Sequence, residues 1–414
     1  MKKFDIPLYY RSSIISVVKN ARKIQDPRKR DYSPSVLDFG PVQFLIARHF
    51  GFCYGVENAI EIAYKTLENN PGKRIYLLSD MIHNPSVNED LKQRGIRFIR
   101  EHDGSQIIKW EELERDDIVI VPAFGTTLEI QETLKNRGIN PYLYDTTCPF
   151  VEKVWNRAES LGSKDYTIIV HGKYKHEETI ATFSHSKKNS PTVIVRNKEE
   201  AMQLAGIITG KIESTLFYDI FRDKYSTGFN VEHDLERVGV VNQTTMLTTE
   251  TQEIANIFRN AMISKFGEEN IDGHFADTSD TLCYATYDNQ RATMGLIDSH
   301  ADFAIVVGGY NSSNTSHIVE LCEEKLPVYF ISGADKIITE QIIKHFDIHS
   351  HSELSTESWI KKENDKAVKI ILTSGASCPD AILDEVLQKI VSFFPGAKSI
   401  DEALKPFSEH LQNN

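Results

Sequence analysis

The sequence is short of cysteine, of close cysteine pairs and of long apolar runs, and it has a deficit of positive charge. Only five cysteines occur in 414 residues, and no two of them form a C-x-x-C pair. This spacing argues against a disulfide framework and against the proximal dithiol of a thiol-based redox protein. We therefore expect the cysteines to be thiols or metal ligands in a reducing compartment.

The remaining absences concern membranes and nucleic acids. No apolar run approaches the roughly 20 residues that a membrane span requires, and the opening residues lack the pattern of a signal peptide. The formal net charge is -12 and the pI is near 5.7, whereas binding to a phosphate backbone needs clustered Lys and Arg. We expect a soluble, cytoplasmic protein that binds neither a membrane nor nucleic acid.

Strand-like and helix-like segments alternate from Val42 onward, which is typical of α/β proteins. The expected strands are Val42 to Ala47, Arg74 to Leu78, Asp117 to Val121, Tyr166 to Val170, Thr192 to Val195, Val238 to Val241, Phe303 to Val307, Val328 to Ile331 and Val368 to Leu372. Because 414 residues exceed one ordinary domain, we expect two or three lobes.

The domain organisation is predicted from composition and from the spacing of these segments. The first 40 residues hold nine Lys and Arg against four Asp and show weak periodicity, so we interpret them as an appended arm. The predicted parts are an N-terminal extension (1–41), a first lobe (42–147), a second lobe (148–282) with an insertion at about 206–236, a third lobe (283–390) and a C-terminal tail (391–414).

Polar turns follow several of the expected strands, at the position where ligands bind in open α/β sheets. These turns lie at 123–127, 171–173, 242–245, 308–314 and 374–377, and they are rich in hydroxyl, amide and small side chains. Together with the backbone N–H groups of a helix start, such side chains make an anion cradle that suits phosphate without a large positive field.

Three cysteines each precede a helix-like run, about one lobe apart along the chain. They are Cys53 in GFCYG, Cys148 in TTCPF and Cys283 in TLCYAT. A helix N-terminus favours the thiolate, which is the form that ligates metal. Any one of them alone would be interpreted as a small buried apolar residue, but three in one pattern predict a shared metal centre. Cys322 and Cys378 are not predicted as ligands.

Two kinds of metal centre suit three thiolates. Tetrahedral zinc would take three cysteines and a histidine, but structural zinc usually draws on closely spaced cysteine pairs. A 4Fe-4S cluster with its fourth iron open suits scattered ligands better, and we favour it. The alternative function is a non-catalytic zinc protein that recognises a phosphorylated ligand.

Histidines and a carboxylate form a second signal. His83 lies in a turn that follows an expected strand, and His176-Glu177-Glu178 follows His171 in another strand-end loop. A carboxylic acid in that loop could deliver protons if burial raised its pKa. A solvated loop of Lys, Glu and His explains the spacing equally well.

Eight sequence blocks, taken in order, resemble the motifs of the 4-hydroxy-3-methylbut-2-enyl diphosphate reductase (LytB/IspH) family. The blocks are GFCYGVENAI, IHNPSVNEDL, TTCPFVEKV, HGKYKHEET, VNQTTM, LCYATYDNQ, GGYNSSNTSH and SGASCPD. The resemblance covers roughly residues 43 to 385 and is specific, because eight separate blocks agree.

This resemblance implies three α/β lobes in a pseudo-threefold arrangement around one central 4Fe-4S cluster per chain. It implies that Cys53, Cys148 and Cys283 ligate the cluster, and that the open iron takes the substrate's hydroxyl oxygen. The implied reaction is a reductive dehydroxylation that yields isopentenyl and dimethylallyl diphosphate, the last step of the non-mevalonate isoprenoid pathway.

The resemblance also implies roles for single residues. Glu178 matches the family's proton-delivering carboxylate, and Thr244 matches the threonine that orients the substrate's hydroxyl group. The substrate contacts that it implies are His83, His176, Thr244, Ser312, Ser313, Asn314 and Ser377.

One position departs from the commoner bacterial pattern. Phe124 stands where many members have a histidine, and phenylalanine cannot donate a hydrogen bond to a phosphate. We expect Lys173, Tyr174 or Thr126 to supply the missing donor. Phe124, the N-terminal extension and the longer middle lobe resemble the plant and cyanobacterial branch, which implies an electron donor such as ferredoxin or flavodoxin.

Overall fold

The computed structural model describes residues 4–101, 104–276, 281–362 and 366–412. The chain divides into two compact units. The terminal unit comprises Met1–Glu57, His83–Val87 and Tyr284–Asn414, and the central unit comprises Asn58–Ile82 and Asn88–Cys283. Across the described ranges, no helix combines the length and the apolar character needed to cross a membrane.

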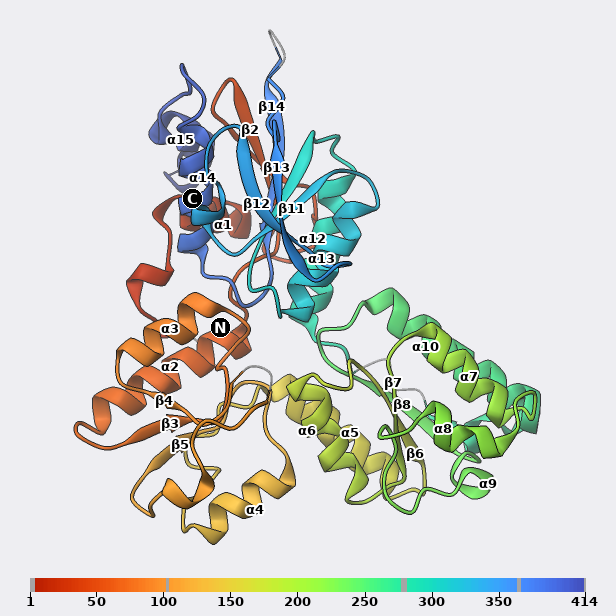
Figure 1. Ribbon diagram of the computed structural model, residues 1–414. Helices are drawn as coiled ribbons and strands as arrows, with labels where there is room; N and C mark the ends of the chain where they lie inside the picture. The colour runs from red at the N-terminus through yellow and green to blue at the C-terminus, as the bar shows by residue number, and fades with distance from the viewer. Residues whose placement is uncertain (1–3, 102–103, 277–280, 363–365, 413–414) are drawn as a thin grey trace. The chain divides into compact units, whose positions relative to one another are not determined.

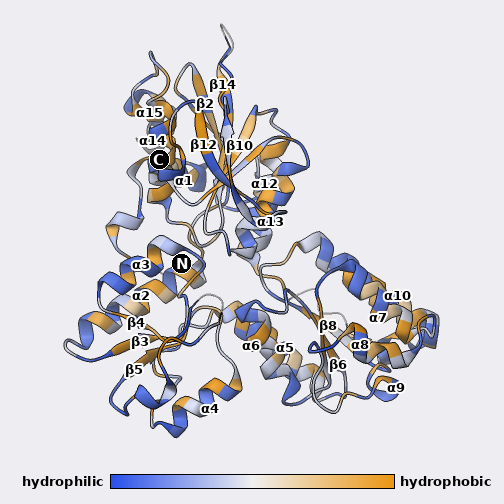
Figure 2. Ribbon diagram, viewed as in Figure 1, coloured by the Kyte–Doolittle hydropathy of each residue, from blue (hydrophilic) through white to orange (hydrophobic). Residues whose placement is uncertain are grey.

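The terminal unit is built on a five-stranded sheet. Its strands, in spatial order, are β1 (Ser35–Asp38), β2 (Val42–Ile46), β14 (Val368–Ser374), β10 (Phe303–Val307) and β11 (Val328–Ile331). β1 is antiparallel to β2, and the other neighbouring strands are parallel. β10 is buried along its whole length, as expected of a parallel strand covered on both faces, and Figure 2 shows the sheet as strongly hydrophobic.

Helices cover both faces of this sheet. Figure 1 shows α12 and α13 on one side of it and α1, α14 and α15 on the other. Their bounds are α1 Ser13–Gln25, α12 Tyr284–Ile297, α13 Ser313–Glu323, α14 Asp380–Val391 and α15 Ile400–Gln412. A two-stranded antiparallel hairpin, β12 (Ile342–Asp347) with β13 (Ser352–Glu357), completes the unit.

The basic N-terminal segment is part of this core, where composition had predicted an appended arm. Ser12 caps α1, since its hydroxyl oxygen accepts a hydrogen bond of 2.9 Å from the Ile15 N–H. Ile14, Ile15 and Val18 of α1 are buried in the apolar core of the unit. Figure 1 shows α1 beside α15, the helix that the expected C-terminal tail forms. Residues from both ends of the chain therefore belong to the same apolar core.

Strand β2 also differs from its predicted place. The spacing of the segments assigns it to the first lobe, but it pairs with β14 in parallel, with Phe44 opposite Ile370. A pairing between strands more than 300 residues apart depends on tertiary packing, and periodicity along the chain does not indicate it.

The central unit contains two separate parallel sheets. The smaller consists of β4 (Arg97–Phe98), β3 (Ile75–Leu77) and β5 (Ile118–Ile120); the larger consists of β7 (Thr192–Val195), β6 (Thr167–His171), β8 (Val238–Asn242) and β9 (Phe275–Ala276). The other helices are α2 Tyr54–Asn69, α3 Pro85–Gln93, α4 Leu128–Asn136, α5 Pro149–Gly162, α6 Glu177–Lys187, α7 Lys198–Ile208, α8 Phe217–Ile220, α9 Val231–Asp234, α10 Thr248–Phe266 and α11 Ile271–His274.

The predicted insertion at about 206–236 contributes to the core of the central unit. Phe217, Phe221 and Phe229 are buried among the side chains of α7 and α10. The rings of Phe217 and Phe229 stack with their centroids 4.8 Å apart. The aromatic residues of the predicted insertion therefore pack against one another and against α7 and α10, within the core of the central unit.

All nine expected strands are present, with ends shifted by at most two residues. Among the described residues, the structure adds five strands that periodicity did not indicate: β1, β4, β9, β12 and β13. β4 and β9 are only two residues long, and β13 is largely exposed and carries the polar sequence SELSTE. The strand-like residues Tyr142 to Tyr144 form a turn, followed by a single bridge between Val121 and Asp145.

If α1 is an integral part of the core, Ile15→Ala should lower the free energy of unfolding by about 2–5 kcal/mol, because a fully buried side chain is truncated. Chemical denaturation measures this change. Ile24→Ala is the matched control, since Ile24 lies on the same helix but is 41% exposed; it should change the free energy by roughly 0.5 kcal/mol or less. Equal effects of the two variants would contradict a buried role for α1.

Candidate functional site

In the terminal unit, predicted site residues gather at the carboxyl ends of three neighbouring strands. Cys53 follows β2, Ser312 to Asn314 follow β10, and Ser377 follows β14. Because β2, β14 and β10 are adjacent and parallel, these ends lie along one edge of the sheet. This is the edge at which ligands bind in open α/β sheets.

Cys53 is held at the start of α2. Its backbone N–H donates to the carbonyl oxygen of Ala376 at 3.3 Å, and its own carbonyl oxygen accepts from the Glu57 N–H at 3.0 Å. The first bond ties the cysteine loop to the loop of Ser377, and the second begins the helix. The predicted position of this thiol at a helix N-terminus is confirmed.

The segment Ser312 to Asn314 forms a buried polar cradle at the N-terminus of α13. Ser312 is the N-cap residue, and all three side chains are at most 4% exposed. Asn314 Oδ1 accepts from the Ala376 N–H at 2.8 Å, whereas Asn314 Nδ2 has no hydrogen-bond partner in the part of the chain that is described. A buried, unused donor at a helix N-terminus is suited to an anion.

His83 belongs to the same cluster. Its carbonyl oxygen accepts a hydrogen bond of 3.2 Å from Ser377 Oγ. Gly309 allows this close approach, because a Cβ atom at that position would lie only 2.3 Å from the His83 carbonyl oxygen. The structure thus brings His83, Ser312, Ser313, Asn314, Ser377 and the loop of Cys53 together within the terminal unit.

In the central unit, a second cluster forms around the first turn of α6. His176 is the N-cap residue, and its Nδ1 atom accepts from the Glu178 N–H at 3.2 Å. Glu178 is the second residue of α6 and is 2% exposed. The carboxyl end of β6 and the following loop position both residues, as the sequence predicts for a strand-end site.

Glu178 and Thr244 are in direct contact. The Thr244 N–H donates to Glu178 Oε1 at 2.5 Å, and the Thr244 hydroxyl donates to Oε2 at 3.0 Å. Burial raises the pKa of Glu178 to about 7, although both bonds from Thr244 act in the opposite direction. Near neutral pH the carboxyl group is therefore protonated in a large fraction of molecules, as a proton donor requires.

Glu177 is a second carboxyl group that sequence patterns did not single out; the residue is half-buried, and its Oε2 atom is shielded from solvent. Burial raises its pKa to about 7 as well, against the effect of a hydrogen bond from Ser79. Its Oε2 atom has no hydrogen-bond partner among the described residues. Adjacent glutamates are common on exposed helix starts, so only the packing distinguishes this pair.

Cys148 and Cys283 also lie at helix starts, as predicted. Cys148 is the N-cap residue of α5, and its N–H donates to the Ala123 carbonyl oxygen at 3.0 Å. Cys283 immediately precedes α12 and is buried. Two residues earlier, Thr281 Oγ1 donates to Asn242 Oδ1 at 2.6 Å, which fastens the segment to the end of β8.

The other two cysteines were not predicted as ligands. All five cysteines lie in described segments, and none of them forms a disulfide. Burial raises the pKa of Cys322 to about 12, and burial also raises the pKa of Cys378. The thiolate, which is the ligating form, is therefore disfavoured in both. Cys322 is buried in the core, as predicted, and Cys378, which was predicted only to lie near the site, is buried as well.

The three predicted ligands do not all belong to one unit. Cys53 is in the terminal unit, and Cys148 and Cys283 are in the central unit. Within the described ranges, no group of three or more His, Cys, Asp and Glu side chains could hold a metal ion. A centre shared by the three cysteines therefore stays a prediction.

Phe124, the position that departs from the bacterial pattern, contacts a predicted substrate residue. Its ring meets the His176 imidazole edge to face, with the centroids 5.7 Å apart. Of the three proposed replacements, Tyr174 is the most exposed, at 39%. Lys173 donates its backbone N–H to Gln243 Oε1 at 3.1 Å, and the Thr126 carbonyl oxygen accepts from His185 Nε2.

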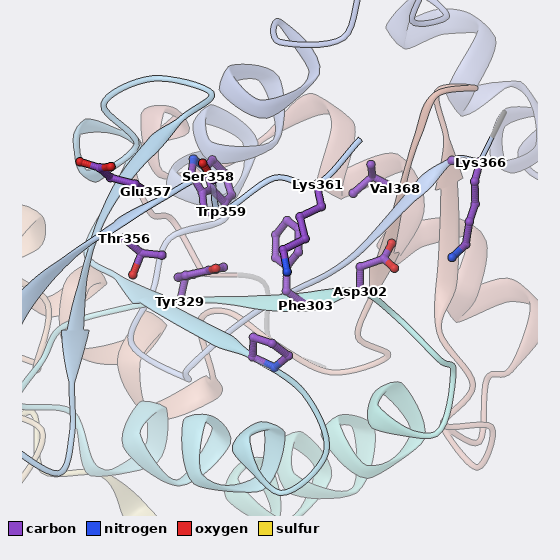
Figure 3. A pocket seen from close by; sticks show the side chains of 12 residues that line it. Asp302, Phe303, Tyr329, Thr356, Glu357, Ser358, Trp359, Lys361, Lys366 and Val368 are labelled. Atoms are coloured by element: carbon purple, nitrogen blue, oxygen red, sulfur yellow. The ribbon is translucent and has the colours of Figure 1, made fainter. Parts of the chain in front are cut away.

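A hollow of about 380 Å³ lies elsewhere in the terminal unit. Phe303, Tyr329 and Trp359 line it together with Lys361 and Lys366 (Figure 3). It lies at the amino end of β10, whereas the predicted residues follow the carboxyl end of that strand. This hollow contains none of the predicted site residues.

Residues 44–391 match the family model described as LytB protein. The chain belongs to the LytB family. Three cyanobacterial relatives are named 4-hydroxy-3-methylbut-2-enyl diphosphate reductase. The Picosynechococcus protein is 40% identical over 89% of this chain and 88% of its own. The Gloeobacter violaceus protein is 38% identical over 89% of each chain, and the Prochlorococcus marinus protein is 37% identical over 93% and 96%.

Two solved structures of reductases share the fold. One is an (E)-4-hydroxy-3-methyl-but-2-enyl diphosphate reductase, described as the terminal enzyme of the non-mevalonate pathway. Its sequence is 24% identical to this chain and its TM-score is 0.51, and the match covers 84% of this chain and 98% of that protein. The other, the E-1-hydroxy-2-methyl-but-2-enyl-4-diphosphate reductase from Plasmodium falciparum, is 21% identical with a TM-score of 0.61, covering 89% and 98%.

These findings confirm the predicted family and the α/β fold class. They also bear out the predicted reductase function, and they do not favour the alternative of a non-catalytic zinc protein. The similarity to cyanobacterial members agrees with the branch that the sequence resembles.

The contact between Glu178 and Thr244 can be tested in the protein without substrate. Thr244→Val removes the hydroxyl donor but keeps the backbone donor, so the pKa of Glu178 should rise further above about 7. Infrared difference spectra, recorded during a pH titration, follow the carboxyl stretch. Thr244→Ser keeps the hydroxyl group and should leave the titration unchanged. A titration near 7 in the valine variant would show that the hydroxyl contact is absent.

Proposed function

We propose that this chain catalyses the reductive dehydroxylation of 4-hydroxy-3-methylbut-2-enyl diphosphate to isopentenyl and dimethylallyl diphosphate. The observation that carries the proposal is the buried Glu178 carboxyl group, whose pKa is about 7 and which Thr244 holds in place. It occurs in a member of a family whose named relatives are reductases of this diphosphate. A proton donor of this kind is what the removal of a hydroxyl group requires.

The cofactor that we propose is a 4Fe-4S cluster, one per chain, with Cys53, Cys148 and Cys283 as its ligands. The donor set suits this group, because each thiol lies at the start of a helix of at least 14 residues, where the thiolate is favoured. When bound, such a cluster supplies electrons one at a time and a Lewis-acidic iron.

The anionic end of the substrate is assigned to the polar cradle and its neighbours. Asn314 Nδ2, the unused buried donor at the start of α13, supports this role. The proposed diphosphate contacts are His83, His176, Ser312, Ser313, Asn314 and Ser377. These groups bind through hydrogen bonds from hydroxyl, amide and imidazole side chains, so the site does not need a cluster of Lys and Arg.

Glu178 and Thr244 are assigned to the reactive end. The overall step consumes two electrons and two protons, breaks the allylic C–O bond and releases water. Glu178 delivers a proton to the departing oxygen and becomes a carboxylate, which the two Thr244 donors then stabilise. The Thr244 hydroxyl, fixed by this contact, orients the substrate's hydroxyl group.

We further propose that the enzyme works in the cytoplasm and takes its electrons from a carrier such as ferredoxin or flavodoxin. The similarity to cyanobacterial reductases supports a carrier of this type. None of the five cysteines, all of which lie in described segments, forms a disulfide, which is consistent with a reducing compartment.

Glu178→Gln should keep the cluster's brown colour and lose most turnover, because an amide cannot deliver the proton. Anaerobic turnover with an artificial reductant measures this.

The rate of the wild-type protein should fall as the pH rises through about 7, since the raised pKa of Glu178 means that the proton is lost in that range.

Glu177→Gln is the matched control. It changes a buried carboxyl group with the same raised pKa on the same helical turn, but one bonded to Ser79. We expect turnover close to that of the wild-type protein. Loss of turnover in Glu177→Gln, with retention in Glu178→Gln, would transfer the proton path to Glu177.

The donor that replaces the bacterial histidine at Phe124 can be found by substitution. Lys173→Ala, Tyr174→Phe and Thr126→Val each remove one candidate donor, and we expect one of them to raise the KM for the diphosphate while kcat changes little. Steady-state kinetics with an artificial reductant measures both constants. Unchanged KM values in all three variants would contradict the hypothesis.

A further inference from the structure

The N-terminal segment is a basic region in an acidic protein. The whole chain has 47 Lys and Arg against 59 Asp and Glu, and its first 40 residues hold nine Lys and Arg against four Asp. The remaining residues therefore hold 38 Lys and Arg against 55 Asp and Glu. A local field of this kind, opposite to that of the rest of the chain, orients and attracts a charged partner.

This basic segment packs against the loop that carries Cys53. The Phe4 ring contacts Tyr54 edge to face with the centroids 4.9 Å apart, and the Tyr10 ring contacts Phe52 at 5.8 Å. Phe52 and Tyr54 flank Cys53 in the sequence. The segment is therefore attached on both sides of the thiol, within the terminal unit.

A hollow of about 280 Å³ opens beside this loop, and we call it the basic hollow. Cys53 lines it together with Lys19, Lys23, Lys29 and Arg48. Lys19 is paired with Asp380 at 2.7 Å, and Arg48 with Asp26 at 3.6 Å.

By contrast, Lys23 and Lys29 have no ion-pair partner in the described part of the chain. Their charges are available to a partner molecule.

Two of these basic side chains act on His49, which also lines the basic hollow. Burial lowers the pKa of His49 to about 4, and the neighbouring charges of Arg48 and Lys29 act in the same direction. Asp288 lines the hollow too; burial raises its pKa, and the positive charges of Lys29 and Arg48 act in the opposite direction.

We propose that the basic hollow is the docking surface for an acidic protein that carries a one-electron centre. The proposal rests on the proposed function, in which Cys53 ligates the cluster that receives the electrons. Each encounter oxidises the carrier by one electron, so two encounters supply one turnover. Charge complementarity selects the partner, because unpaired lysines beside the thiol attract an acidic surface and repel a basic one. A carrier seated there would be close to a cluster ligand.

Lys23→Glu with Lys29→Glu tests the surface. With a plant-type 2Fe-2S ferredoxin as the reductant, the double variant should lose at least about tenfold in rate at low salt, and its rate should depend less on ionic strength than that of the wild-type protein. With methyl viologen, which needs no docking surface, both proteins should turn over equally. Lys164→Glu with Lys211→Glu, exposed lysines of the central unit, makes the same change in net charge and should behave as the wild-type protein does.

The outcomes separate the two proposals. If the wild-type protein fails to turn over with methyl viologen, the reductase function is refuted. If it turns over but the ferredoxin rates of the two double variants are equal, the docking surface is refuted and the reductase function stands. Sedimentation with anionic lipid vesicles supplies a third arm. Binding that Lys23→Glu with Lys29→Glu abolishes would assign the surface to a membrane and overturn the proposal of a protein partner.

Discussion

The structure depends on the way in which parallel strands align their carboxyl ends. In the terminal unit, β2, β14 and β10 lie side by side and point the same way, so the loops that follow them share one edge of the sheet. That alignment brings Cys53, the segment Ser312 to Asn314 and Ser377 together although more than 300 residues separate the first from the last. The same rule places Glu178 and Thr244 beyond the ends of β6 and β8, which are also parallel neighbours.

Burial then determines what the collected side chains can do. Glu178 and Cys378 are both buried, and in both the neutral form is favoured. For the carboxyl group, the consequence is a pKa close to neutral pH and thus a usable proton. For the thiol, the consequence is that the reactive thiolate form is disfavoured. Burial raises the pKa of both groups, but the carboxyl group starts from a much lower pKa than the thiol does. Only the carboxyl group is therefore brought close to neutral pH.

The charged residues are distributed unevenly along the chain. The net charge is negative, yet the basic segment is packed around Phe52 and Tyr54, on both sides of Cys53. The polar cradle at α13 offers neutral donors and a helix N-terminus, the features that suit an anion without a cluster of cations. The basic segment thus packs against the loop of one thiol, whereas the side chains of the cradle itself carry no positive charge.

The sequence alone determined the α/β class, nine strands, the helix-start position of three cysteines and, through eight motif blocks, the family. These features are local: a strand or a helix start is encoded within a few residues, and a motif is read without knowing its neighbours in space. The sequence did not indicate that α1 joins the core, that β2 pairs with β14, or that the Oε2 atom of Glu177 is buried. Only the tertiary structure decided these points, because burial and strand pairing depend on contacts between residues that are far apart along the chain.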